Sequence, residues 1–230
     1  MNGGAPPVGE PAAVGDPERR PRAGALAGRF VRLEPLRPGA DAPELYAASH
    51  GSPELERVWS YMAYGPFADA GAMRGWLEIC AASRDPLFLA AIEPASGSRV
   101  GMVSFLNVAP EMRRLEIGNI WYAARVHRTR VNTEAAWLML RHAFDDLGYR
   151  RVEWKCDALN AASRRAALRL GFAFEGIFRQ HLIVKGCNRD TAWYAMLDGE
   201  WPARRRRLET WLESDGSQSL GALAADAAGS

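Results

Sequence analysis

Two polar turns, each following a strand-like segment and opening a helix, contain the residues whose types and spacing could do chemistry. The first is residues 127–132 (His-Arg-Thr-Arg-Val-Asn), between the strand-like segment 115–122 and a long apolar helix that Thr133 opens. Unpaired N–H groups and the dipole at a helix N-terminus both favour an anion. This turn therefore predicts a phosphate site, to which Arg128 and Arg130 would add charge-assisted contacts.

The second turn carries an amide and a hydroxyl. Residues 151–156 read as a short strand, and Asn160 and Ser163 then start a helix that ends at residues 170–172 (Leu-Gly-Phe). An asparagine N-cap with a serine in the first turn is a common helix start, so the pair alone indicates only a cap. This helix start follows the phosphate-like turn directly. The two turns together are therefore a more specific signal of a binding site than either turn alone.

Composition limits the class of protein. The 230 residues are 48% hydrophobic, enough for the core of one domain, and the formal charge of +2 makes no general case for nucleic acid. The three cysteines are widely spaced and the histidines form no metal-binding pair, so neither disulfides nor a metal are predicted. No apolar run approaches the ~18 residues of a membrane span. We expect a cytoplasmic protein.

Three parts are expected along the chain. Residues 1–27 are rich in Gly, Ala, Pro and Arg, and residues 214–230 are mostly small or polar. Such segments bury too little apolar surface to offset the entropy of ordering. Both are predicted to be disordered tails, which leaves 28–213 as the folded domain.

The domain is predicted to begin with antiparallel strands and to continue as strand, helix, strand, helix and a closing hairpin. The expected strands are 29–36, 87–92, 100–108, 115–122, 151–156, 174–184 and 191–197, and the expected helices open at Asp41, Asp69, Thr133, Asn160 and Glu200. This order predicts an α+β or α/β sandwich around a mixed sheet.

The order of segments resembles the GNAT superfamily of acyl-coenzyme A-dependent N-acyltransferases, most closely its RimJ/RimL-type branch. The resemblance covers roughly residues 29–212. It implies an α+β fold with a mixed, mostly antiparallel sheet flanked by helices on both faces, and acetyl-coenzyme A (acetyl-CoA) as co-substrate. The segments that carry it are Glu116-Ile117-Gly118, Asn132-Thr133-Glu134-Ala135, His142-Ala143-Phe144, Asn160-x-x-Ser163, Leu170-Gly171-Phe172, Glu175-Gly176, and Arg189-Asp190-Thr191 to Glu200-Trp201-Pro202.

The phosphate turn departs from the family pattern (Gln/Arg)-x-x-Gly-x-(Gly/Ala), because those places hold His127, Arg130 and Asn132. Without glycine, close backbone approach to a pyrophosphate is less assured. Arginine contacts are the expected compensation, and a weakened or repurposed cofactor site is the alternative. The cofactor-binding residues implied here are Arg128, Thr129, Arg130, Val131, Asn132 and Thr133, the last of which also fits a plain N-cap.

The resemblance implies a general base at Glu116, usually acting through water. An acceptor amine is an ammonium at pH 7, because an α-amino group has a pKa of about 7.7–8.0 and a lysine about 10.4. It must lose a proton before it attacks a thioester, and a carboxylate of raised pKa can take that proton. The plainer alternative is a glutamate that pairs with a strand arginine such as Arg113 or Arg179.

Other implied site residues lie on the same strand and at the second helix. Main-chain groups of Ile120, Trp121 and Tyr122 would pair with the pantetheine like an added strand, and an N–H near Ile120 or Trp121 would polarise the thioester carbonyl. The side chains of Trp121 and Tyr122 are expected in the core. Asn160 would meet the pantetheine, and Ser163 would protonate the thiolate leaving group, unless the two are only a helix cap.

The implied function is acetyl transfer from acetyl-CoA to a primary amine by direct attack in a ternary complex, with a protein N-terminus as one candidate acceptor. A covalent acyl-enzyme is not suggested, since Cys156 is the only cysteine near the catalytic segments. One alternative acceptor is a small amine, an amino acid or an antibiotic. Another alternative is a non-catalytic acyl-CoA-binding protein. We expect a monomer or homodimer without a membrane or nucleic-acid partner.

Acceptor specificity is expected in the aromatic segment 59–67 and in the closing hairpin, which carries Arg179 and His181. A strand histidine is more often structural than a ligand. The basic run 204–207 is expected to be a solvated helix face, with RNA contact as the alternative.

Overall fold

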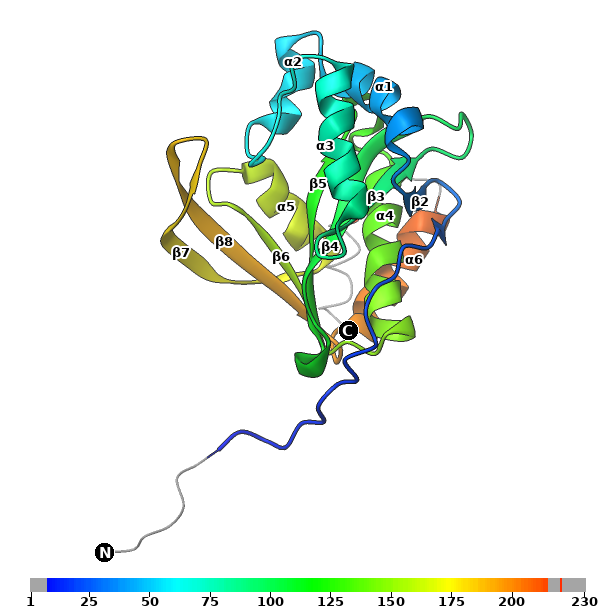
Figure 1. Ribbon diagram of the computed structural model, residues 1–230. Helices are drawn as coiled ribbons and strands as arrows, with labels where there is room; N and C mark the ends of the chain where they lie inside the picture. The colour runs from blue at the N-terminus through cyan, green and yellow to red at the C-terminus, as the bar shows by residue number, and fades with distance from the viewer. Residues whose placement is uncertain (1–7, 215–219, 221–230) are drawn as a thin grey trace, which may run out of the picture.

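The computed structural model describes residues 8–214 and Leu220, which form one mixed sheet with helices on both faces (Figure 1). The strand order is β1-β2-β3-β4-β5-β6-β8-β7, and β5–β6 is parallel while the other described neighbours are antiparallel. The strands are β1 Leu26–Ala27, β2 Arg32–Pro35, β3 Leu87–Ile92, β4 Arg99–Ala109, β5 Arg114–Tyr122, β6 Arg151–Asp157, β7 Ala173–Val184 and β8 Cys187–Leu197. The α-helices are α1 Pro38–Ser49, α2 Pro53–Glu56, α3 Ala70–Ala82, α4 Arg130–Arg141, α5 Ala161–Leu170 and α6 Trp201–Glu213.

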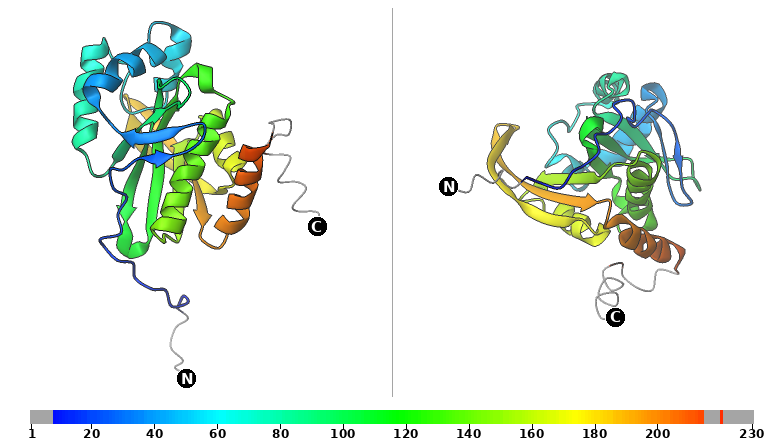
Figure 2. Two further views of the ribbon diagram at one scale, coloured as in Figure 1. Left: turned by 90° about the vertical axis from the view of Figure 1, so that its right-hand side faces the viewer. Right: turned by 90° about the horizontal axis from the view of Figure 1, so that it is seen from below.

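Both faces of the central strands are buried, which explains their continuous apolar runs. In β3, Leu87, Leu89 and Ala91 join the core beneath α4 and α6, whereas the residues between them pack with α1 and α3. Figure 2 shows these helix layers on opposite faces of the sheet. The predicted α+β fold, with a mostly antiparallel sheet and helices on both faces, is confirmed. No helix in the described part of the chain is long and apolar enough to cross a membrane.

Two predicted helix starts are wrong by one turn. Helix α4 begins at Arg130, because Thr129 and not Thr133 is the N-cap, its hydroxyl accepting the Val131 N–H at 3.3 Å. Helix α1 begins at Pro38, and Asp41 lies inside its first turn. Both sequences offer an alternative residue to begin the helix, and propensity alone does not choose between neighbours.

The N-terminal boundary predicted at residue 28 also needs correction. Leu26–Ala27 pair with β2 and belong to the sheet. Upstream, the Tyr149 hydroxyl donates to the main-chain oxygen of Arg19 at 3.0 Å. The predicted disorder of residues 1–7, 215–219 and 221–230 concerns parts of the chain outside the described residues.

Glu134 fastens the beginning of the sheet to α4. Its buried carboxylate accepts the N–H groups of Arg29 at 2.9 Å, Phe30 at 2.6 Å and Val31 at 2.8 Å. A Cβ on Gly28 would lie 2.4 Å from this carboxylate, so that position has room only for glycine. The glutamate of the Asn-Thr-Glu-Ala segment therefore has a structural task.

We expect Glu134→Gln to lower the free energy of unfolding by about 2–4 kcal/mol, because an amide leaves buried N–H donors without an acceptor. Urea unfolding measures the change. Glu78→Gln is the matched control, since Glu78 is exposed on α3 and, among the described residues, pairs only with Arg74. Equal unfolding midpoints for the two variants would contradict the assignment.

Candidate functional site

Strands β5 and β6 run side by side over three residue pairs and then separate. Their register extends from Arg114 opposite Arg151 to Glu116 opposite Glu153, whereas β5 continues to Tyr122. Beyond Glu116, β5 therefore has no strand partner on this side within the part of the chain that the structure describes. An extended ligand could bind to its free main-chain groups as an added strand does.

A β-bulge in β5 produces this separation. Between the pairs that Gly118 and Trp121 make with β4, β5 holds one residue more than its partner, and Asn119 adopts a left-handed φ of 51°. A bulge bends its strand and increases the local twist. The Asn119 amide donates to the Ser104 hydroxyl at 2.9 Å and accepts from the Tyr64 hydroxyl at 3.2 Å, which holds the bulge in place.

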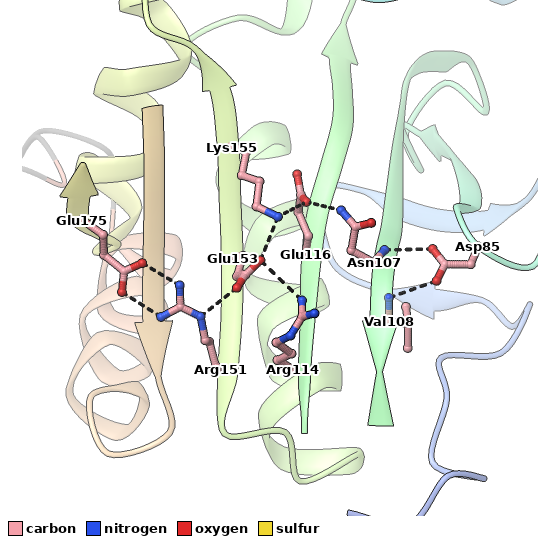
Figure 3. Close-up of polar contacts among 9 residues, drawn as sticks. All are labelled: Asp85, Asn107, Val108, Arg114, Glu116, Arg151, Glu153, Lys155 and Glu175. Carbon is pink, nitrogen blue, oxygen red and sulfur yellow. Dashed lines mark hydrogen bonds and ion pairs between the residues drawn. The ribbon is translucent and has the colours of Figure 1, made fainter. Parts of the chain in front are cut away.

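Glu116 lies at the last pair before the strands separate, and its carboxylate is bound asymmetrically (Figure 3). Oε2 accepts from the Asn107 amide at 2.7 Å and lies 2.9 Å from the Lys155 ammonium. No described residue hydrogen-bonds Oε1, which would lie 3.5 Å from a Cβ on Gly118 and so faces along β5 toward the opening. Oε2 is thus held by two partners, and Oε1 faces the opening between β5 and β6.

The partner of Glu116 is Lys155, so the predicted alternative pairing with Arg113 or Arg179 is wrong. Burial raises the pKa of Glu116 above its ordinary value, and Lys155 and Asn107 oppose this effect without cancelling it. A buried carboxylate of raised pKa suits proton acceptance. One signal for Lys155 is present in the sequence: it lies two residues beyond Glu153 and hence on the same face of the strand.

At the second turn, Asn160 is the N-cap of α5. Its Oδ1 accepts the Ser163 N–H at 3.0 Å, as the cap interpretation predicted, and its NH₂ group remains for other partners. The Ser163 hydroxyl accepts from the Trp154 indole at 2.9 Å. Burial raises the pKa of the Cys156 thiol, and a hydrogen bond with Ser163 opposes the rise. Ser163 thus lies between the site and the core.

The two arginines of the phosphate turn lie differently. Arg128 is exposed with a left-handed φ of 62°, and no described residue pairs with its guanidinium. Arg130 stacks against Phe30 at 5.2 Å and Trp211 at 6.0 Å, and donates to the main-chain oxygen of Ser214. Arg130 is therefore engaged in packing.

The other residues of this turn differ in burial. Thr129 is exposed, Asn132 is half-buried and Val131 is buried. Thr133 is fully buried and accepts from Arg169 at 2.8 Å, so its hydroxyl faces the interior. In this turn, Arg128 is the exposed cation that a phosphate can reach, beside the main-chain N–H groups at the start of α4.

The side chains of Trp121 and Tyr122 are buried, as predicted, and Ile120 is half-buried. Trp121 packs against Trp59 with ring centroids 4.9 Å apart. Burial lowers the pKa of His50 nearby, whose Nε2 accepts the Phe67 N–H at 2.8 Å. In the aromatic segment 59–67, Trp59 is fully buried, and Met62, Tyr64 and Phe67 pack half-buried against the same core.

Two contacts join the aromatic segment to the far side of the opening. The Tyr61 hydroxyl donates to the Leu159 main-chain oxygen at 3.3 Å, and the Lys185 ammonium donates to that of Trp59 at 2.9 Å. In the hairpin, the exposed His181 bonds to Thr191 through Nδ1 at 2.9 Å, and Arg179 is also exposed.

The basic run of α6 also contacts its own chain. Arg205 pairs with Asp145 and Glu209, and Arg207 donates to the main-chain oxygen of Arg169. Among the described residues, no group of three His, Cys, Asp or Glu is placed to hold a metal.

Comparisons with known proteins agree with this geometry. Residues 31–173 match the family described as the acetyltransferase (GNAT) domain. The chain is 33% identical over 109 residues to YdaF of Bacillus subtilis (strain 168), provisionally named a ribosomal N-acetyltransferase; the match covers 47% of this chain and 59% of YdaF. A GCN5-related N-acetyltransferase from Brucella melitensis superposes with a TM-score of 0.86 at 40% identity, covering 91% of this chain and 97% of that one. A probable GNAT acetyltransferase from Chromobacterium violaceum gives 0.76 at 35% identity, with 86% and 100% covered.

Proposed function

Because the chain belongs to the GNAT acetyltransferase family, we propose that it transfers the acetyl group of acetyl-CoA to a primary amine, by direct attack in a ternary complex. Acetyl-CoA is the acetyl donor of this family. The observation that carries the proposal is the carboxylate of Glu116, with Oε2 anchored and Oε1 presented where β5 and β6 separate.

Acetyl-CoA would lie along the free edge of β5. The N–H near Ile120 or Trp121 would polarise the thioester carbonyl, and Asn160 would offer its NH₂ group to the pantetheine. Glu116 Oε1 would take a proton from the acceptor ammonium, directly or through water. The neutral amine then forms a C–N bond to the acetyl carbon and the C–S bond breaks. The attacking nitrogen releases its surplus proton to water, and the thiolate receives a proton, for which Ser163, reprotonated from water, is our proposed donor.

The pyrophosphate would bind at the N-terminus of α4, through main-chain N–H groups and Arg128. The turn lacks glycine at positions 130 and 132, but Arg128 is exposed and no described residue pairs with its guanidinium, so it can make a direct charge-assisted contact. This arginine supports a working cofactor site over the weakened one.

For the acceptor we favour the α-amino group of a protein N-terminus over a small amine. The name of YdaF supports this choice, although the chain spans only 59% of the length of that relative. The open hairpin face beside the site would accommodate a peptide.

A screen of N-terminal peptides and small amines with acetyl-CoA tests the proposal, with release of free thiol as the measurement. We expect thiol release that depends on the amine, and a product about 42 Da heavier than that amine, because one acetyl group replaces one hydrogen. Coenzyme A binding by calorimetry without turnover on any amine would overturn it in favour of a non-catalytic binder.

Glu116→Gln is expected to lower turnover at pH 7 by about 10²–10⁴-fold, because the amide cannot accept the amine's proton. The loss should shrink as pH rises, since the acceptor then arrives already neutral. Glu78→Gln serves as the control. A variant with full turnover at pH 7, or one equally slow at pH 9.5, would show that Glu116 is not the base.

We expect Arg128→Ala to weaken coenzyme A binding roughly tenfold, the loss of one charge-assisted contact of about 1.5 kcal/mol. Arg130→Ala should instead lower the free energy of unfolding and leave that affinity nearly unchanged, because Arg130 packs against Phe30 and Trp211. Calorimetry and urea unfolding of both variants separate the two roles. Weaker coenzyme A binding in Arg130→Ala with unchanged stability would show that Arg130, and not Arg128, contacts the phosphate.

A further inference from the structure

Lys155 is the only described cation paired with Glu116. Its Nζ lies 2.9 Å from Glu116 Oε2, 2.9 Å from Glu153 Oε2 and 3.8 Å from the centre of the Trp193 ring. The side chain is 11% exposed. A buried ammonium needs such partners, because two carboxylates and an aromatic face replace the water that it loses.

The charges around this ammonium are matched. Glu153 also binds Arg151 at 2.8 Å and faces Arg114 at 3.9 Å, and Arg151 continues to Glu175 on β7 (Figure 3). Three carboxylates thus meet three cations across β5, β6 and β7. Removing Lys155 from this row leaves the buried carboxylate of Glu116 without a described counter-ion, whereas Glu153 keeps Arg151.

Asn107 approaches the same oxygen from β4. Asp85 accepts the N–H groups of Asn107 at 2.9 Å and Val108 at 3.0 Å, which fixes a bulge where Asn107 has a φ of 50°. The bulge aims the Asn107 amide at Glu116 Oε2. The Asn107 amide can orient the carboxylate but carries no charge. The positive countercharge beside Oε2 therefore comes from Lys155.

We infer, resting on the proposed function, that Lys155 is a positioning residue for the transfer: its ammonium holds Glu116 as a carboxylate and fixes Oε2, so that Oε1 is free to accept the proton of the acceptor. Without Lys155, Glu116 would face Glu153 across the strand pair in a buried setting. Both effects favour the protonated acid, which cannot act as a base.

The direct test is a ¹³C NMR titration of the glutamate side-chain carboxyls, with the Glu116 resonance identified by its loss in Glu116→Gln. Lys155→Met keeps a long unbranched side chain but removes its charge. In this variant the titration midpoint of Glu116 should rise by about 1–3 on the pH scale. Lys155→Arg should restore most of the change. In Glu153→Gln, which removes a like charge and leaves Lys155 in place, the midpoint should fall. An unchanged midpoint in Lys155→Met, or a rise in Glu153→Gln, would overturn the inference.

Activity supplies a second measurement. With one acceptor, the ratio of kcat/KM in Lys155→Met to that in the wild type cancels the titration of the amine. The ratio should be smallest at low pH and approach 1 at high pH, while the Kd for coenzyme A stays constant. A ratio independent of pH would mean that Lys155 is merely structural. If the wild type acetylates no amine, the proposed function fails, but the NMR titration still decides the role of Lys155.

Discussion

The site depends on one constraint: β5 holds one residue more than β4 needs between Gly118 and Trp121. Because pairing continues on both sides, the extra residue is accommodated locally, at Asn119, and the strand bends there. The bend opens a gap between β5 and β6 just beyond Glu116. Helix α4 follows β5 and α5 follows β6, so the gap lies between the segments that lead into two helix N-termini.

The same geometry explains why a buried charge can be kept at Glu116. Residues two apart share a face of a strand, which places Arg151, Glu153 and Lys155 in a row beside Glu116. Burial raises the pKa of Glu153, but its hydrogen bonds with Arg151 and Lys155 outweigh burial and bring it below the ordinary value. At Glu116 burial prevails and the pKa is raised. Two carboxylates sharing one lysine therefore differ in basicity, and the more basic one lies at the opening.

Much of this fold could be predicted from the sequence, because strand runs, helix caps and the Glu116-Ile117-Gly118 and Asn160-x-x-Ser163 segments are local signals. The predictions from the sequence were wrong or incomplete where two neighbouring residues were equally suited to one role. Thr129 and Thr133 could each cap α4, and the structure uses Thr129 while Thr133 is buried. Arg128 and Arg130 were equivalent by charge, and only the packing of Phe30 and Trp211 distinguishes them.

Long-range contacts were beyond the reach of local patterns. Lys155 and Asn107 come from two different strands, and their convergence on Glu116 depends on the register of β4, β5 and β6. The task of Glu134 depends on residues more than a hundred positions away. Spacing along the chain places Lys155 on the strand face of Glu153, but only the strand register shows that this face meets Glu116.

Under the proposed function, the acceptor would approach from the side of the sheet that the helices leave open. Helices α1 and α3 pack over β3 and β4, whereas β7 is exposed along most of its length. Trp59 is fully buried, so it shapes the wall of the site from behind and is not itself a surface for the acceptor. The residues that reach across the opening are Tyr61, bonded to Leu159, and Lys185, bonded to Trp59. Both bonds end on main-chain oxygens, so they do not depend on the side chains of Leu159 and Trp59. Under the proposed function, differences in acceptor would arise from side chains further along the exposed β7.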